Sequence, residues 1–140
     1  MISYPAVIFK DEPGVSVFFP DLDYIGTCGD DMNQALENAI DLLAGFAYDK
    51  KLEGKELPLA SEFEAIDPEA VSEFLEISDV VRDGFVNIIS VDLDSYATQH
   101  FEKLVRKTLT IPDRLNKLAM EANINFSKTL QEALIAKLFG

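Results

Sequence analysis

The first thirty positions contain short apolar runs separated by turn-forming residues, a pattern that is typical of β-strands. An apolar run covers residues 4–10, and the next run places Val15, Val17 and Phe19 on one face. Turn-forming residues follow each run, and a third run covers residues 24–28. The pattern predicts a meander of three antiparallel strands.

The spacing of apolar residues changes to that of a helix after residue 31. One continuous stripe is formed by Met32, Ala35, Leu36, Ala39, Ile40, Leu43, Phe46 and Ala47. Asp31, with Gln34 three residues later, resembles a capping box, and Gly54 is a typical helix end. A long helix after three strands predicts an α+β layer, in which the helix packs across the sheet.

The middle of the chain is less regular. Residues 55–80 are rich in acids, and we expect a long, partly ordered excursion with a helical turn at residues 68–74. Residues 85–91 are rich in β-branched side chains and predict a fourth strand that completes the sheet. We therefore assign residues 1–93 to one α+β domain and residues 94–103 to a linker.

Residues 104–140 predict a different, smaller unit. A short strand at residues 106–112 has Leu109 and Ile111 on one face, and two amphipathic helices follow it. Pro112 suits the first helical position, Asn123 a left-handed helix end, and Ser127 the N-cap of the second helix.

A strand and two helices of this length cannot bury their apolar faces alone, and a single strand leaves its edges unpaired. Two copies that pair their strands and interlock their helices would solve both problems. The paired ribbon would fit the major groove of DNA. The alternative is a helical hairpin that docks on the first domain.

Charge divides the chain in the same way. The 140 residues include 12 Lys and Arg and 25 Asp and Glu, for a net charge of −13. Residues 1–103 have 6 basic and 22 acidic side chains, a net charge of −16, whereas residues 104–140 have 6 and 3, a net charge of +3. Such asymmetry indicates two different partners, and only the tail should favour nucleic acid.

Other simple features exclude whole classes of protein. A single cysteine excludes a disulfide framework and a multi-cysteine metal site within one chain. The N-terminus lacks the basic leader of a signal peptide, and no apolar run approaches the roughly 20 residues that cross a bilayer. We expect a soluble, cytoplasmic protein that does not bind membranes.

Both halves of the chain resemble HicB-family antitoxins. In the tail, the resemblance lies in residues 106–112 (RKTLTIP) and 123–134 (NINFSKTLQEAL), which look like a ribbon-helix-helix domain. In the first domain it lies, in order, in Tyr-Pro-Ala at 4–6, Phe-Phe-Pro-Asp-Leu at 18–22, Gly-Asp at 29–30 and Ala-Leu-Glu-Asn-Ala at 35–39. These motifs resemble the partial RNase H-like domain of the family. Asn123 departs from the glycine that the family usually has there.

The resemblance implies an antitoxin of a type II toxin–antitoxin system, which masks a HicA-like toxin (a small basic ribonuclease that cleaves mRNA). It also implies a homodimer or higher even oligomer that binds operator DNA through its tail and represses its own operon. The implied groove-reading residues are Arg106, Thr108 and Thr110, with Lys107 nearby. Ser127 and Lys128, with the helix amides, would hold a phosphate.

The physical argument adds a candidate toxin surface. An acidic body suits a basic RNA-binding partner through steering and charge complementarity. We expect the toxin to dock on the sheet and its rim, near Asp11, Glu12, Asp21, Asp23 and Tyr24.

Enzymatic and metal-sensing functions are disfavoured. Two-metal nuclease chemistry needs carboxylates that converge on paired cations, and the first strand has no acid in its interior. Cys28, expected to be buried, and His100, expected to be exposed, are too few for a transition-metal site. We expect no cofactor and no metal. The alternative function is a stand-alone ribbon-helix-helix repressor whose N-terminal domain senses a small ligand.

Overall fold

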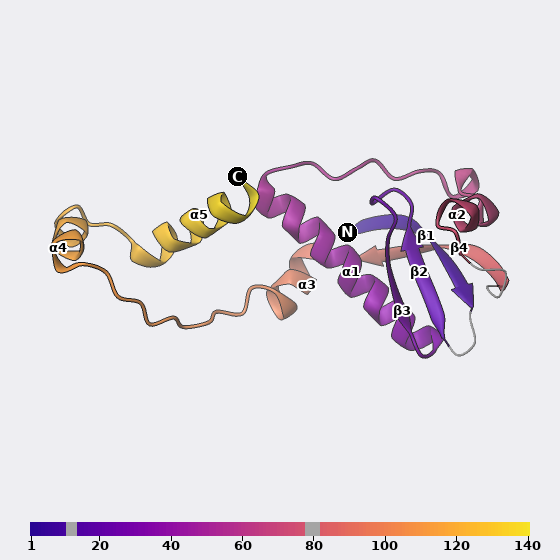
Figure 1. Cartoon of the computed structure of the whole chain (residues 1–140), viewed down its shortest axis with the longest axis horizontal. Coiled ribbons are helices and arrows are strands. Elements are labelled where there is room, and N and C mark those ends of the chain that lie inside the picture. Colours follow the sequence, from indigo (N-terminus) through magenta and orange to yellow (C-terminus); the bar gives the residue numbers. More distant parts are fainter. Residues whose placement is uncertain (11–13, 78–81) are drawn as a thin grey trace.

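One antiparallel sheet of four strands organises the first two thirds of the chain (Figure 1). The computed structural model describes residues 1–10, 14–77 and 82–140. The strands are β1 (Ile2–Lys10), β2 (Val15–Phe19), β3 (Ile25–Gly29) and β4 (Arg82–Val91), in the order β3-β2-β1-β4. The predicted meander is confirmed, and the predicted fourth strand joins it beside β1, so that β1 lies inside the sheet.

Every second side chain of β2 points to the inner face of the sheet, the face that is buried in the core. Val15, Val17 and Phe19 are buried, as predicted, while the residues between them are only partly covered. The third strand begins one residue later than predicted because Tyr24 belongs to a turn. Asp23 and Tyr24 have φ angles of 56° and 57°, and the amide of Ile25 donates to the carbonyl of Leu22 across them.

Helix α1 (Met32–Glu53) lies across the inner face and buries the small residues of its stripe. The predicted cap is confirmed: an Asp31 carboxylate oxygen accepts from the Gln34 amide at 2.8 Å. The Gln34 side chain in turn accepts from the Asp30 amide at 2.6 Å, one residue earlier than a standard capping box requires. Gly54, with φ of 71°, ends the helix as predicted.

The opposite face of the sheet is covered by the acid-rich middle segment. After α1, residues 55–62 have no regular secondary structure, and a 3-10 turn η1 (Phe63–Ala65) and helix α2 (Pro68–Phe74) follow. Val71 of α2 is buried with Val7 and Phe9 of β1 in a second small core. The predicted helical turn at residues 68–74 is therefore confirmed.

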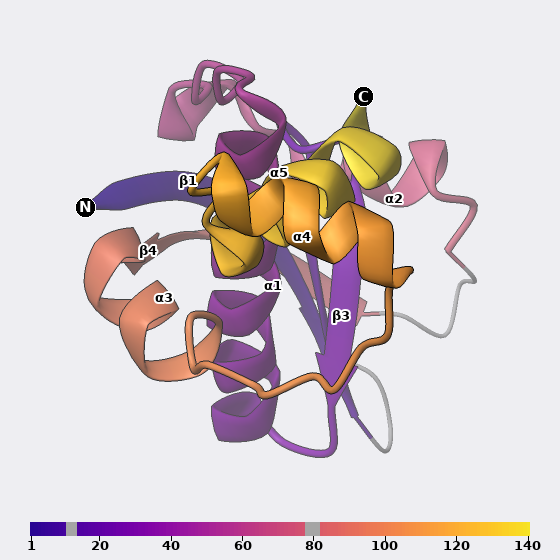
Figure 2. The ribbon, with the colours of Figure 1, turned by 90° about the vertical axis from the view of Figure 1, so that its left-hand side faces the viewer.

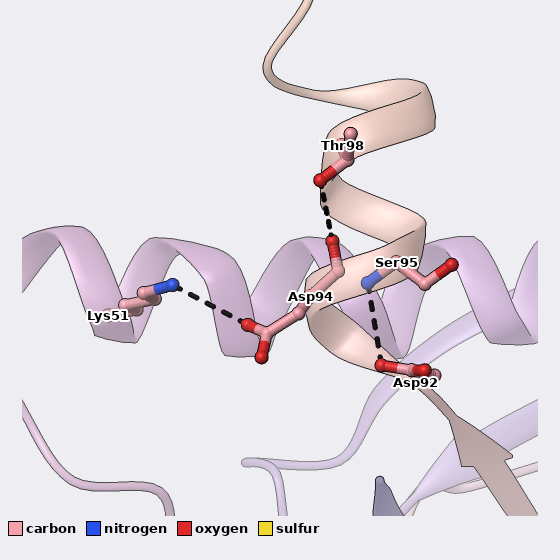
Figure 3. A network of polar contacts seen from close by, with 5 residues as sticks. All are labelled: Lys51, Asp92, Asp94, Ser95 and Thr98. Carbon is pink, nitrogen blue, oxygen red and sulfur yellow. Dashed lines mark hydrogen bonds and ion pairs between the residues drawn. The ribbon is translucent and has the colours of Figure 1, made fainter.

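Helix α3 (Leu93–His100) follows β4 and packs beside α1 (Figure 2). Its N-cap is Asp92, whose carboxylate accepts from the Ser95 amide at 3.4 Å, and the Thr98 hydroxyl donates to the Asp94 carbonyl at 2.9 Å (Figure 3). An exposed ion pair of 3.7 Å between Lys51 and Asp94 connects it to α1. Most of the segment expected as a linker is thus helical.

After α3 the chain leaves the sheet, and its C-terminal helix turns back to contact α1. Residues 102–112 have no regular secondary structure and lead to α4 (Asp113–Glu121) and α5 (Phe126–Phe139) (Figure 1). The strand expected at residues 106–112 is not formed, because a strand needs a neighbouring strand and none of the described strands lies beside this segment. Within the described residues, no helix is long and apolar enough to cross a membrane.

Candidate functional site

The tail, residues 104–140, leaves its apolar side chains uncovered. All of it is described, and none of its residues is buried. The exposed large apolar side chains include Leu109, Ile111, Leu115, Leu118, Met120, Ile124, Phe126, Leu134 and Leu138. So many exposed apolar groups at regular helical spacing mark a contact surface rather than a solvent-facing one.

A groove of about 520 Å³ lies between the extended segment and the start of α5. Lys107, Leu109 and Ile111 line one side of it, and Phe126 and Leu130 are among the residues of the other. The lining residues of the extended segment are every second residue, as a strand requires. The segment therefore keeps the alternation that the sequence predicts, although it has no strand partner.

The predicted DNA-binding residues divide between two positions. Those of the extended segment are Arg106, Lys107, Thr108 and Thr110, all exposed, and those of the first turn of α5 are Ser127 and Lys128, also exposed. Lys107 and Ser127 meet at the groove, whereas the other four do not line it. Lys107 thus shares the side of Leu109 and Ile111, opposite to the predicted base-reading residues.

The helix ends of the tail correct two predictions. Asn125, not Ser127, is the N-cap of α5, because its side chain accepts from the Lys128 amide at 3.0 Å. The Lys128 amide therefore already donates a hydrogen bond within the helix cap and cannot also donate to a phosphate. Pro112 lies at the N-cap of α4 rather than at its first helical position. Asn123 adopts the predicted left-handed conformation, with φ of 60°.

The predicted toxin-facing residues have unequal roles. Both carboxylate oxygens of Asp21 accept from Ser61, at 2.7 Å from its amide and 2.5 Å from its hydroxyl. Asp21 therefore holds the middle segment against the turn between β2 and β3. Asp23 is exposed in that turn. Asp11 and Glu12 lie outside the described residues.

Tyr24 also connects the turn to the middle segment. Its ring stacks on that of Phe74, with a centroid distance of 4.2 Å and an interplanar angle of 26°. A third connection comes from Tyr4, whose hydroxyl donates to the carbonyl of Pro58. The sequence analysis missed Ser61, Pro58 and Phe74, because no local pattern indicates contacts between residues so far apart in the chain.

Two phenols have perturbed acidity. Burial raises the pKa of Tyr4, and the negative charge of Asp21 raises it further. Burial also raises the pKa of Tyr96, whose hydroxyl donates to the Asp41 carboxylate at 2.9 Å. Both hydroxyls act as hydrogen-bond donors in the fold, so their neutral forms are the structural ones.

The candidate metal-ligating residues Cys28 and His100 are both exposed. No group of three or more His, Cys, Asp or Glu side chains converges among the described residues. Cys28 is exposed, contrary to expectation, because β3 is an edge strand and Cys28 lies on the face opposite α1, paired with Ser16 of β2. His100 is exposed and stacks on Tyr96, with ring centroids 4.1 Å apart.

Comparison with known proteins gives structural neighbours only. No protein-family model and no curated protein matches this chain. A solved toxin–antitoxin complex from Streptococcus pneumoniae contains a chain that is 29% identical, with a TM-score of 0.61 over 97% of this chain and 98% of that chain.

Two solved antitoxins also match almost end to end. The antitoxin HicB of Burkholderia pseudomallei is 19% identical over 99% of this chain and 97% of its own, with a TM-score of 0.47. The antitoxin HicB3 is 23% identical over 99% of both chains, with a TM-score of 0.46. The likeness to the chain of the pneumococcal complex spans both halves of this chain, and the sequence motifs quoted above also lie in both halves. The chain thus resembles the HicB-family antitoxins over its whole length.

Proposed function

We propose that this protein is the antitoxin of a type II toxin–antitoxin system, with residues 1–93 masking a HicA-like, mRNA-cleaving ribonuclease. The observation that carries the proposal is the likeness, over almost the whole of both chains, to a chain of the pneumococcal toxin–antitoxin complex. The division of charge supports it, because the body, residues 1–103, has a net charge of −16 and would attract a basic RNA-binding protein. Both its toxin and its operator would place the protein in the cytoplasm.

The tail supplies the second half of the proposal, which is repression of the antitoxin's own operon. Residues 104–140 would form a ribbon-helix-helix homodimer in which the two extended segments pair. Leu109 and Ile111 then face the helices, and Arg106, Thr108 and Thr110 face the major groove of operator DNA. The uncovered apolar residues of the tail and its net charge of +3 support this arrangement.

The masking function is tested with the product of the gene beside this one. The purified neighbour, incubated with RNA, should cleave it, and an equimolar amount of the full-length antitoxin should stop the cleavage. A heat-denatured antitoxin sample controls for carry-over of buffer components. Continued cleavage at a tenfold excess of antitoxin would contradict the masking function. DNA binding without masking would favour the ligand-sensing repressor instead.

The repressor function is tested on DNA that covers the start of the operon. Full-length protein should shift this DNA and leave a scrambled duplex of equal length unshifted at physiological salt. Leu109→Glu should abolish both the shift and dimer formation in light scattering, because it places a charge in the dimer core. A variant that stays monomeric and still binds this DNA with full affinity would contradict the ribbon-helix-helix mode.

A further inference from the structure

The middle segment, residues 55–77, is fixed to the body although much of it lacks regular structure. Tyr4 holds it at Pro58, Asp21 holds it at Ser61, and Tyr24 holds it at Phe74. These three anchors lie on β1 and on the turn between β2 and β3. The segment is therefore a defined surface, presented at one end of the sheet (Figure 1).

Its exposed side chains are of two kinds. Leu59 is 93% exposed, Phe74 65% and Phe63 46%, although neighbours such as Leu57 and Val71 are packed into the two cores. Around them are acids that are all exposed, namely Glu56, Glu62, Glu64, Asp67, Glu69, Glu73 and Glu76. With Lys55 as the one basic residue against these seven acids, residues 55–77 have a net charge of −6.

Large apolar side chains within a charged rim are the composition of a protein–protein interface. The strong negative charge selects the partner. Nucleic acid and a second copy of the same acidic surface would both be repelled, whereas a protein rich in Lys and Arg would be attracted.

We infer that residues 59–74, together with the turn at the exposed Asp23 and the partly buried Tyr24, form the surface that docks the basic toxin. This inference rests on the proposed function and names the toxin-facing site of the antitoxin. Leu59 and Phe74 provide the apolar contacts, and the surrounding acids pair with basic side chains of the toxin. Asp21 acts indirectly, because it uses both carboxylate oxygens to position Ser61.

The surface is tested by biolayer interferometry, which measures how the full-length protein binds the toxin encoded by the neighbouring gene. The toxin is first inactivated at its catalytic residue. Leu59→Ser should raise Kd at least tenfold. Leu104→Ser is the matched control, because Leu104 is 91% exposed but lies outside the surface, and it should leave Kd unchanged. An equal loss in both variants, or no loss with Leu59→Ser, would overturn the inference.

The charge contribution is tested at two salt concentrations. The triple variant E62Q/E64Q/E73Q should slow association several-fold at low salt and flatten its salt dependence. The control E37Q/D49N/E102Q removes the same number of exposed acids elsewhere and should have a smaller effect. If the wild-type protein binds the toxin but the two triple variants have equal effects, the inference is overturned and the proposed function is upheld. Failure of the wild-type protein to bind the toxin would overturn both.

Discussion

Removal of the Asp21 carboxylate should loosen the middle segment and measurably lower the stability of the body. Asp21 accepts two hydrogen bonds from Ser61, one from the amide and one from the hydroxyl, and both groups are partly buried. A hydrogen bond to a charged group contributes about 1.5–3 kcal/mol, and two bonds that share one carboxylate contribute less than twice that. We expect Asp21→Ala to lower the free energy of unfolding by about 2–3 kcal/mol.

A double-mutant cycle separates the two bonds. Ser61→Ala removes the hydroxyl and keeps the amide, so it should cost about 1 kcal/mol in the wild-type background. In the Asp21→Ala background, where the hydroxyl has lost its acceptor, the same change should cost little. The coupling energy between Asp21 and Ser61 should therefore be about 1 kcal/mol.

Urea denaturation followed by circular dichroism measures these energies, and amide hydrogen exchange at Ser61 reports the local effect. Asp23→Ala is the matched control, since Asp23 is an exposed acid of the same turn and no hydrogen bond of its side chain is seen among the described residues. A coupling energy near zero, with unchanged exchange at Ser61 in Asp21→Ala, would refute the role of this carboxylate as an anchor.

Four further predictions follow from the same structure. Asn125→Ala should destabilise α5 by about 1 kcal/mol in thermal melts, while Ser127→Ala should not, because only Asn125 caps the helix. Burial raises the pKa of Tyr4 in the folded protein above its value in the unfolded chain. The neutral Tyr4 hydroxyl should therefore contribute fully to the free energy of unfolding below about pH 10, and this contribution should be lost as the pH rises through the folded pKa. Tyr4→Phe should reduce this loss of stability at high pH in urea melts. Arg106→Ala should weaken binding to the proposed operator by about 1–3 kcal/mol and relax specificity, whereas Lys128→Ala should weaken all DNA alike and lower the salt slope by about one. If two tails fold together, the tail should melt at a lower temperature than the body, and its melting temperature should fall as the protein is diluted.

The elements of the body were predictable because their patterns are local. The alternation at Val15, Val17 and Phe19 required a strand with one buried face, and the stripe from Met32 to Ala47 required a helix with one buried side. The cap at Asp31 and the end at Gly54 follow from short-range hydrogen bonding and backbone freedom. These features depend on residues no more than a few positions apart.

The contacts that build the candidate docking surface were not predictable for the opposite reason. Ser61 is 40 residues from Asp21, and Pro58 is 54 residues from Tyr4. Their pairing depends on how β1, the turn after β2 and the middle segment come together. The predicted N-cap at Ser127 was wrong because Asn125 is also a good N-cap, and the backbone places Asn125 at the helix start.

The two halves of the chain differ in how much of their structure a single copy completes. The body has a closed core, in which residues of β1, β2 and α1 are fully buried, and three of its exposed large apolar side chains lie on the acidic middle segment. The tail has no buried residue, and its extended segment keeps a strand-like alternation with no strand to pair with. The body therefore has a core of its own, whereas the tail would acquire one only in the proposed dimer. In the proposed arrangement this difference would link the amount of the protein in the cell to repression, because the DNA-binding unit would exist only when two copies meet, while the toxin-binding surface would be complete in one.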